Sequence, residues 1–129
     1  MKVVSDTARE CGARVKGVLP RFMDGLEYPD LDELVWTPTM SERKEEMRAG
    51  VSLAVALPGG IGTLDELTET CTLVRLHQTD AKVVILNVNG FYDLLEKLFD
   101  HYVETGMLDV PTRRKIIFVR TIEEFKAEL

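Results

Sequence analysis

Cysteine, histidine and long apolar runs are scarce in this 129-residue chain, and each scarcity excludes a class of protein. Two cysteines, Cys11 and Cys71, and two histidines, with no Cys-x-x-Cys pair, argue against a zinc site, and we expect both thiols to be free and buried. No apolar run approaches the roughly 20 residues of a membrane span. The first ten residues turn polar at once, without the apolar core of a signal peptide. We therefore expect a cytoplasmic protein that does not associate with membranes.

Basic residues are also few compared with acidic ones. Sixteen basic residues stand against 22 acidic ones, which gives a net charge of −6. This balance argues against nucleic-acid binding, because a protein that contacts the phosphate backbone needs a basic face. We expect the basic cluster Arg113–Arg114–Lys115 to be a solvated helix surface. The length and the apolar content of 45% suit a single globular domain over residues 1–129.

Helical and extended patterns alternate along the chain. The predicted helices are 1–11, 39–50, 64–77, 91–106 and a last one after Thr121, and the predicted strands are 14–20, 34–37, 51–57, 82–88 and 115–119. Strands 51–57 and 82–88 are continuous apolar runs, which indicates strands buried on both faces. This order predicts an α/β fold with a Rossmann-like, doubly wound and mostly parallel sheet.

Local signals mark several helix ends. Thr39 or Ser41 is expected to cap the second helix and Gly50 to end it. Thr121 and Glu124 have the spacing of a capping box for the last helix. In helix 91–106 the periodicity places six apolar side chains on one side: Leu94, Leu95, Leu98, Phe99, Tyr102 and Val103.

The stretch LPGGIGTLDELTE, residues 57–69, joins a predicted strand to a predicted helix through three glycines. Gly59, Gly60 and Gly62 have no Cβ, so their backbone amides can approach an anion closely, and the positive end of the helix favours a phosphate there. Thr63 could add a hydroxyl or cap the helix. The turn has neither the Lys-Ser/Thr pair of a P-loop nor the spacing of a dinucleotide-binding fingerprint.

A purely structural interpretation of this turn stays open. Thr63 and Glu66 have the spacing of a capping box, and Asp65 and Glu66 in a first helical turn would stabilise it by roughly 0.3–1 kcal/mol. Similarly, Arg43 and Lys44 in the charge-rich segment SERKEEMR could belong to a solvated helix face with i,i+4 ion pairs.

Two motifs give the chain a family resemblance. PGGIGTLDE resembles the PGGxGTxxE signature of the LOG family, the cytokinin-activating phosphoribohydrolases that are often labelled lysine decarboxylases. TMSERKEEM resembles that family's Met-x-x-Arg-Lys helix, and the segments GVLPRF, ILNVNGFYDLL and IIFVRTIEEF are also similar. The resemblance covers essentially all 129 residues.

The resemblance implies hydrolysis of the N-glycosidic bond of a nucleoside 5′-monophosphate, such as a cytokinin riboside 5′-monophosphate or AMP. It implies Arg43 and Glu66 as the catalytic pair and no metal or organic cofactor. The implied substrate-binding residues are Lys44, Gly59, Gly60, Ile61, Gly62 and Thr63. A homodimer with its active site near the subunit interface is also implied, and a helix face bearing Leu67, Cys71 and Val74 is compatible with it.

Against the family pattern, we expect the chain to lack roughly two N-terminal strands and a helix. Two other functions remain open: a non-catalytic carrier of a phosphorylated ligand such as the molybdenum cofactor, which shares a PGGxGT-like turn, and an inactive truncated homologue. The preferred base, adenine or an N6-modified adenine, also remains open.

Overall fold

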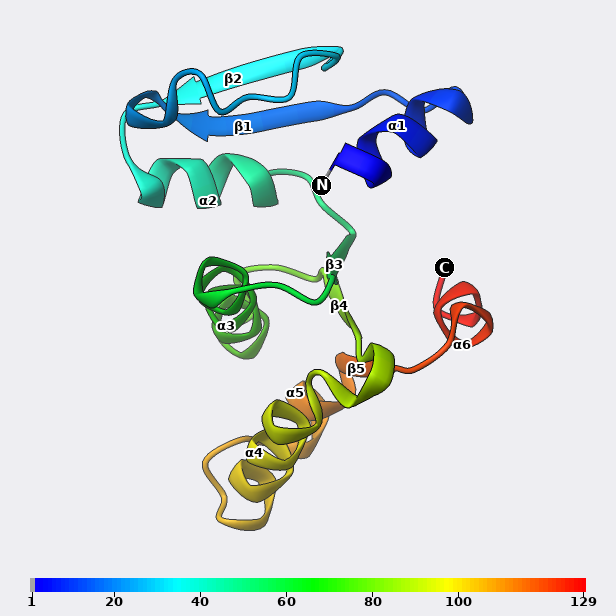
Figure 1. The fold of residues 1–129 in the computed structure, drawn as a ribbon. Helices are drawn as coiled ribbons and strands as arrows, with labels where there is room; N and C mark the ends of the chain where they lie inside the picture. The colour runs from blue at the N-terminus through cyan, green and yellow to red at the C-terminus, as the bar shows by residue number, and fades with distance from the viewer. Residues whose placement is uncertain (1) are drawn as a thin grey trace. The chain divides into compact units, whose positions relative to one another are not determined.

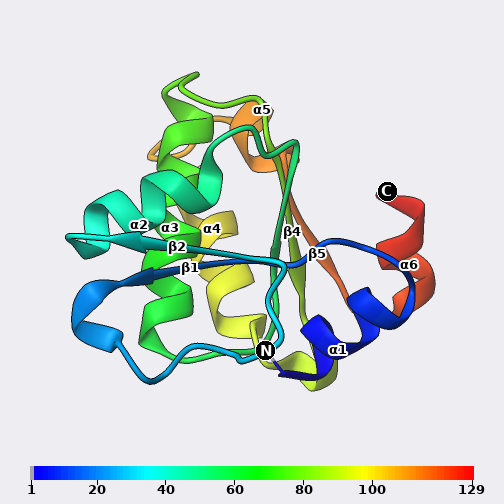
Figure 2. The same ribbon diagram turned by 90° about the horizontal axis from the view of Figure 1, so that it is seen from above.

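The computed structural model describes residues 2–129, and the contacts divide the chain into two compact units, Met1–Ala49 and Gly50–Leu129. Each unit is described on its own, and the single domain expected from the sequence stays a prediction. Helices alternate with strands in both units (Figures 1 and 2), and every strand pair in the described residues is parallel. The predicted α/β class with parallel sheets is confirmed.

The first unit is a parallel strand pair with two helices. Its elements are α1 (Lys2–Glu10), β1 (Lys16–Pro20), the 3-10 helix η1 (Arg21–Met23), β2 (Glu33–Thr37) and α2 (Met40–Arg48). The register of β1 and β2 places Val18 opposite Val35. The hydroxyl of Thr39 accepts a hydrogen bond from the Glu42 amide at 3.2 Å, so Thr39 rather than Ser41 caps α2. The predicted elements of this unit are confirmed, except that Met1 lies outside the described residues.

The second unit is a three-stranded parallel sheet with helices on both faces. Its elements are β3 (Leu53–Ala56), α3 (Ile61–Arg75), β4 (Lys82–Leu86), the 3-10 helix η2 (Val88–Gly90), α4 (Asp93–Glu104), α5 (Val110–Arg114), β5 (Ile116–Val119) and α6 (Ile122–Ala127). The strand order is β3-β4-β5. Figure 1 shows α3 and α4 on one side of these strands and α6 on the other.

Strand β4 supplies both apolar layers of this unit. Val83 and Ile85 face a cluster built with α3, α4 and β5, whereas Val84 and Leu86 face a second cluster that includes Phe125 of α6. Successive side chains of a strand point to opposite faces, so a central strand covered on both sides must be apolar throughout. The prediction that this run is buried on both faces is confirmed for residues 83–86.

The same prediction is wrong for strand β3. Its Val55 side chain is 42% exposed, although Ala56 is buried. β3 lies at the edge of the three-stranded sheet, with β4 as its neighbour within the unit. An apolar run therefore indicated a strand here but did not indicate its position in the sheet.

Helix α3 uses its apolar face inside the unit. Leu67, Cys71 and Val74 are buried against β4, β5 and α4. The expectation that this face is compatible with a dimer interface is wrong, because packing within the unit's own core already covers these side chains.

The six apolar side chains predicted for one side of α4 form two stripes. Phe99 is buried and Leu95 packs against the core, but Leu94 is 80% exposed, and Leu98 and Tyr102 are exposed as well. Residues i, i+4 and i+8 share a stripe, so the positions 94, 98 and 102 turn together away from the core. The six residues therefore lie on one side of α4, as predicted, but only part of that side is buried.

The basic cluster 113–115 begins inside the short helix α5, which was not predicted as a separate element. Asp109 caps this helix by accepting a hydrogen bond from the Thr112 amide at 2.8 Å. Arg113 donates from Nε to Asp100 at 2.9 Å, and its guanidinium lies 5.3 Å from the centroid of the Phe118 ring. The expected solvated surface is therefore wrong for Arg113, which ties α5 to α4 and β5.

The last helix begins as predicted. The Thr121 hydroxyl accepts a hydrogen bond from the Glu124 amide at 3.1 Å. The Glu124 carboxylate accepts one from the backbone of Arg120 at 2.6 Å, one residue before the position that a standard capping box uses. No helix within residues 2–129 has the length and apolar character needed to cross a membrane.

The two cysteines are free, but only one is buried. Cys11 is exposed, which corrects the expectation of two buried thiols, and burial raises the pKa of Cys71 to about 12. Because only a thiolate reacts with alkylating reagents, we expect one equivalent of iodoacetamide to be incorporated at pH 8 and a second only after denaturation. Mass spectrometry of the labelled protein checks this, and Cys11→Ser should abolish native labelling. Two equivalents in the native protein would contradict the buried position of Cys71.

Candidate functional site

The glycine-rich turn between β3 and α3 forms the start of α3. The helix begins at Ile61, three residues before the predicted start, and Gly60 is its N-cap with an extended backbone. The Leu64 amide makes a helical bond to the Gly60 carbonyl at 3.1 Å. The N–H groups of residues 61–63 precede that bond and face the end of the helix, where the helix dipole is positive. Such an arrangement of amides is suited to an anion.

The predicted capping box is wrong. Thr63 is the third residue of α3 rather than its cap, no side chain caps this helix, and no acidic residue lies in its first turn. Gly60 takes the cap position and Gly62 is included in the helix, so the start shifts toward the N-terminus. Asp65 and Glu66 lie beyond the first turn, where stabilisation by the helix dipole has fallen off. Capping therefore does not explain these acidic residues.

The three glycines of the turn differ in their surroundings. A Cβ on Gly59 would lie 2.3 Å from Oγ1 of Thr63, whereas a Cβ on Gly60 or Gly62 would meet no described atom within 4 Å. Gly59 thus makes room for the Thr63 side chain. Gly60 and Gly62 border open space next to the amides. Ile61 between them is 83% exposed, so it is not part of the apolar core.

This difference predicts opposite effects on stability and binding. Gly62→Ala should leave the melting temperature unchanged or raise it, because alanine is favoured over glycine in a helix by up to about 1 kcal/mol. The same methyl group should weaken binding of inorganic phosphate at least about fivefold, which corresponds to ~1 kcal/mol. Calorimetry and a phosphate titration followed by NMR measure the two effects.

Gly59→Ala is the matched comparison. Its methyl group must displace Thr63, so the variant should lose about 1–3 kcal/mol of unfolding free energy. A Gly62→Ala protein that is destabilised and binds phosphate unchanged would contradict the assignment of open space beside the amides.

Glu66 lies in α3, shortly after the glycine-rich turn. It follows Gly62 by four residues and is half-buried, beside the buried face formed by Leu67, Thr70, Cys71 and Val74. Residues four apart on a helix are neighbours on its surface, about 6 Å apart along its axis. The carboxylate can therefore act on a group next to an anion bound at the turn.

Arg43 and Lys44 lie in the first unit, on α2, and both are half-buried. Arg43 donates from Nε to the Val18 carbonyl of β1 at 3.0 Å. The buried Thr37 donates to the Thr39 carbonyl at 3.1 Å, which secures the segment leading into α2. The Arg43 side chain is therefore held by β1 through this bond rather than extending freely into solvent.

The predicted residues thus form two groups. The second unit brings together Gly59, Gly60, Ile61, Gly62, Thr63 and Glu66 at the start of α3, and the first unit holds Arg43 and Lys44 on adjacent positions of α2. Within residues 2–129, no three His, Cys, Asp or Glu side chains are placed to hold a metal ion.

Sequence reasoning missed Tyr92, which contacts the turn directly. Its hydroxyl donates a hydrogen bond to the Leu57 carbonyl at 2.7 Å, although the two residues are 35 positions apart. The available signal was an aromatic residue with a polar tip, two positions after the Asn89-Gly90 turn that follows the most buried strand. Its partners are backbone atoms, which no side-chain motif specifies.

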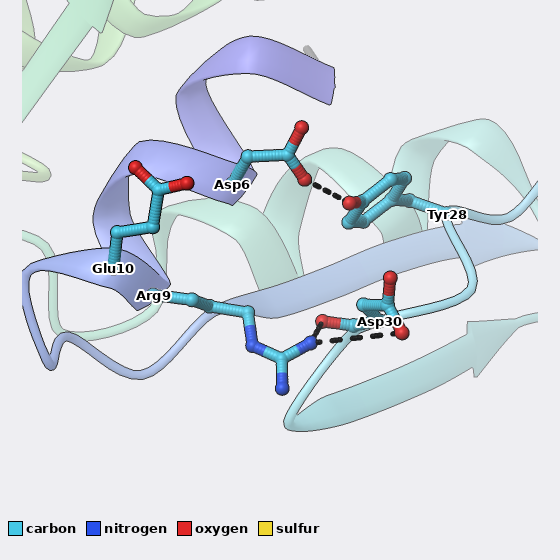
Figure 3. A pocket seen from close by; sticks show the side chains of 5 residues that line it. All are labelled: Asp6, Arg9, Glu10, Tyr28 and Asp30. Carbon is cyan, nitrogen blue, oxygen red and sulfur yellow. Dashed lines mark hydrogen bonds and ion pairs between the residues drawn. The ribbon is translucent and has the colours of Figure 1, made fainter.

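A pocket of about 460 Å³ lies in the first unit, between α1 and the loop before β2 (Figure 3). Four of its lining residues are joined in two pairs: the Tyr28 hydroxyl donates to the Asp6 carboxylate, and the Arg9 guanidinium donates to the backbone carbonyl of Asp30. Hydrogen bonds from Lys2 and then Tyr28 lower the pKa of Asp6. Three of the five lining residues are carboxylates, so this pocket repels a phosphate and ties α1 to the loop instead.

Comparison with known proteins relates the whole chain to one family. The family model described as "Possible lysine decarboxylase" matches residues 1–129. A cytokinin riboside 5′-monophosphate phosphoribohydrolase of Mycobacterium marinum is 35% identical over 126 residues, which are 96% of this chain and 67% of that protein. An Arabidopsis thaliana protein of the same name is 35% identical over 131 residues, with 100% of this chain and 61% of that protein covered.

A probable cytokinin riboside 5′-monophosphate phosphoribohydrolase of Oryza sativa subsp. japonica is 34% identical over 131 residues, with 100% of this chain and 57% of that protein covered. The chain thus spans 57–67% of the length of these three relatives. Because the family model and the relatives agree over nearly the whole chain, we conclude that it belongs to the possible lysine decarboxylase family, which includes the LOG proteins.

Proposed function

We propose that the protein is a nucleoside 5′-monophosphate phosphoribohydrolase. Water would replace the base at C1′ of the ribose, and the products would be the free base and ribose 5-phosphate. The observation that carries this proposal is the set of exposed amides at the start of α3 with the Glu66 carboxylate one helical turn further along. The names of the relatives support a cytokinin riboside 5′-monophosphate as substrate, with AMP as the simpler alternative.

The 5′-phosphate would bind at the glycine-rich turn. The amides of residues 59–63 and the positive end of α3 supply the attraction, and the open space beside Gly60 and Gly62 lets the phosphate oxygens approach the backbone. Binding by backbone groups fixes the sugar relative to α3 without a flexible cationic side chain. This placement orients the glycosidic bond for the next step.

Glu66 would act on the sugar. Cleavage of an N-glycosidic bond develops positive charge on the ribose, as in the oxocarbenium-like transition states of glycoside hydrolysis. A carboxylate held beside the sugar lowers the energy of that charge, and it can also orient the attacking water. Because Glu66 lies on a helix, its carboxylate would stay at a nearly constant distance from the bound phosphate.

Arg43 would orient the nucleotide and ease departure of the base, and Lys44 would be a second contact for an anion. The guanidinium is permanently charged and planar, and the bond from Nε to Val18 fixes its stem on β1. A lysine at position 43 would lack both the planar fork and the Nε donor.

Release of free base tests the proposal. The chain is incubated with AMP or isopentenyladenosine monophosphate, and base and ribose 5-phosphate are separated by chromatography. Arg43→Ala should lower kcat/KM about 10²-fold or more. Arg14→Ala, which removes an exposed arginine of the same unit, should leave the rate unchanged.

The other outcomes are informative as well. Equal rates for Arg43→Ala and the unsubstituted chain would remove Arg43 from the mechanism. Stoichiometric capture of a phosphorylated ligand without turnover would favour the non-catalytic carrier instead.

A homodimer is a further part of the proposal. The exposed apolar stripe of α4, formed by Leu94, Leu98 and Tyr102, supports an interface on that helix. Sedimentation measures the assembly directly. The cytoplasmic location, and the absence of nucleic-acid and membrane partners, stay predictions from the sequence.

A further inference from the structure

Tyr92 connects the start of α4 to the glycine-rich turn. The residue is 6% exposed, and its ring meets Phe91 edge-on with centroids 4.8 Å apart. Its hydroxyl donates to the Leu57 carbonyl at 2.7 Å. The phenol therefore holds the backbone directly before Pro58.

The hydroxyl has a specific task at this point of the chain. Leu57 follows the last residue of β3, and Pro58 has no N–H to continue a strand or start a helix. Backbone groups that leave a sheet need other partners, and the buried hydroxyl supplies a donor to the Leu57 carbonyl. Burial raises the pKa of Tyr92, so the hydroxyl keeps the proton that it donates to Leu57.

Tyr92 is itself held by the end of the sheet. Asn87, which is fully buried after β4, accepts a hydrogen bond from the Tyr92 amide at 2.7 Å and donates one to Asp93 at 2.7 Å. The backbone N–H of Asn87 donates to the Val119 carbonyl of β5 at 2.7 Å. A continuous series of hydrogen bonds thus runs from β5 through Asn87 and Tyr92 to the turn.

We propose that Tyr92 is a positioning residue that holds the Leu57 carbonyl and thereby presets the glycine-rich turn for the substrate phosphate. The proposal rests on the assignment of this turn to the 5′-phosphate under the proposed function. Tyr92 does not touch the reacting atoms. It acts through the backbone of residues 57–59.

Tyr92→Phe isolates the hydroxyl, because the ring and its packing remain. We expect the dissociation constant of ribose 5-phosphate to rise about five- to tenfold, the size of one lost hydrogen bond. KM for AMP should rise by a similar factor while kcat changes less than about twofold, because the phosphate is bound alike in the ground and transition states. Damage to the fold would instead lower kcat through a smaller active fraction and leave KM unchanged.

Hydrogen exchange provides a measurement that is independent of activity. In Tyr92→Phe, exchange of the backbone amides of residues 59–63 followed by NMR should accelerate at least about fivefold, because the turn loses the bond that holds Leu57. Tyr102→Phe makes the same chemical change on the exposed side of α4 and should leave exchange of these amides unchanged. Unchanged exchange of residues 59–63 and unchanged ribose 5-phosphate affinity in Tyr92→Phe would overturn the proposal, as would a fall in kcat at constant KM.

The measurements separate this proposal from the proposed function. If the unsubstituted chain releases no base, but Tyr92→Phe weakens ribose 5-phosphate binding and accelerates amide exchange in residues 59–63, hydrolysis is wrong and the positioning role stands. If base is released and Tyr92→Phe changes neither quantity, the positioning role alone is wrong. If the unsubstituted chain does not bind ribose 5-phosphate, both are wrong.

Discussion

Replacing Glu66 by glutamine is expected to lower kcat for base release about 10²- to 10³-fold, with little change in KM. Glutamine has nearly the same shape as glutamate, so packing on the flank of α3 is kept and only the negative charge is lost. The charge matters in the transition state, where the ribose becomes positive, and much less in the ground state. Steady-state kinetics with AMP measure both constants.

Glu69→Gln is the matched control. Glu69 is a half-buried acidic residue on the same helix, one turn further from the glycines, and its replacement should leave kcat within about twofold. Equal losses in both variants would point to a general effect of charge on α3. An unaffected kcat in Glu66→Gln would remove the carboxylate from the chemistry.

Replacing Asn87 by alanine is expected to lower the free energy of unfolding by about 2–4 kcal/mol. The substitution leaves the buried Tyr92 amide without its acceptor and removes a donor from Asp93. Each unsatisfied buried group costs about 1–3 kcal/mol, and the missing side-chain atoms leave a small cavity as well. Urea denaturation followed by circular dichroism measures the change.

Asn89→Gly is the control for this prediction. Asn89 is exposed and has a positive φ of 53°, which glycine adopts without strain, so its replacement should change the unfolding free energy by less than about 0.5 kcal/mol. A loss below about 1 kcal/mol in Asn87→Ala would mean that water replaces the amide, and the series of hydrogen bonds through Asn87 would then carry little energy.

The sequence predicted the elements well because their signals are local. Thr39 caps the start of α2, and Gly50, with a φ of +71°, follows its end. The apolar run 82–88 identified β4, because a covered central strand needs apolar side chains on both faces. Burial was harder to predict for Val55, since the same kind of run also forms an edge strand.

In the candidate site, too, some residues could be predicted from local sequence and others could not. The motif located the glycines and Glu66, yet it misplaced the start of α3, because the Thr63–Glu66 spacing of a capping box also occurs inside a helix that begins at Ile61. Tyr92 could not be predicted as a partner of the turn. Its role depends on how α4 leaves β4 and on backbone atoms 35 positions away, and neither is encoded in a short pattern.

The backbone character of the turn has a consequence for mutational scanning. In residues 59–63, an alanine scan deletes atoms only at Ile61 and Thr63, and at the three glycines it adds a methyl group. An alanine scan is meant to reveal the effect of losing a side chain. At these three glycines it would instead measure the effect of an added methyl group that blocks access to the backbone. The N–H donors themselves survive every such change, so removing one requires replacing a peptide bond by an ester.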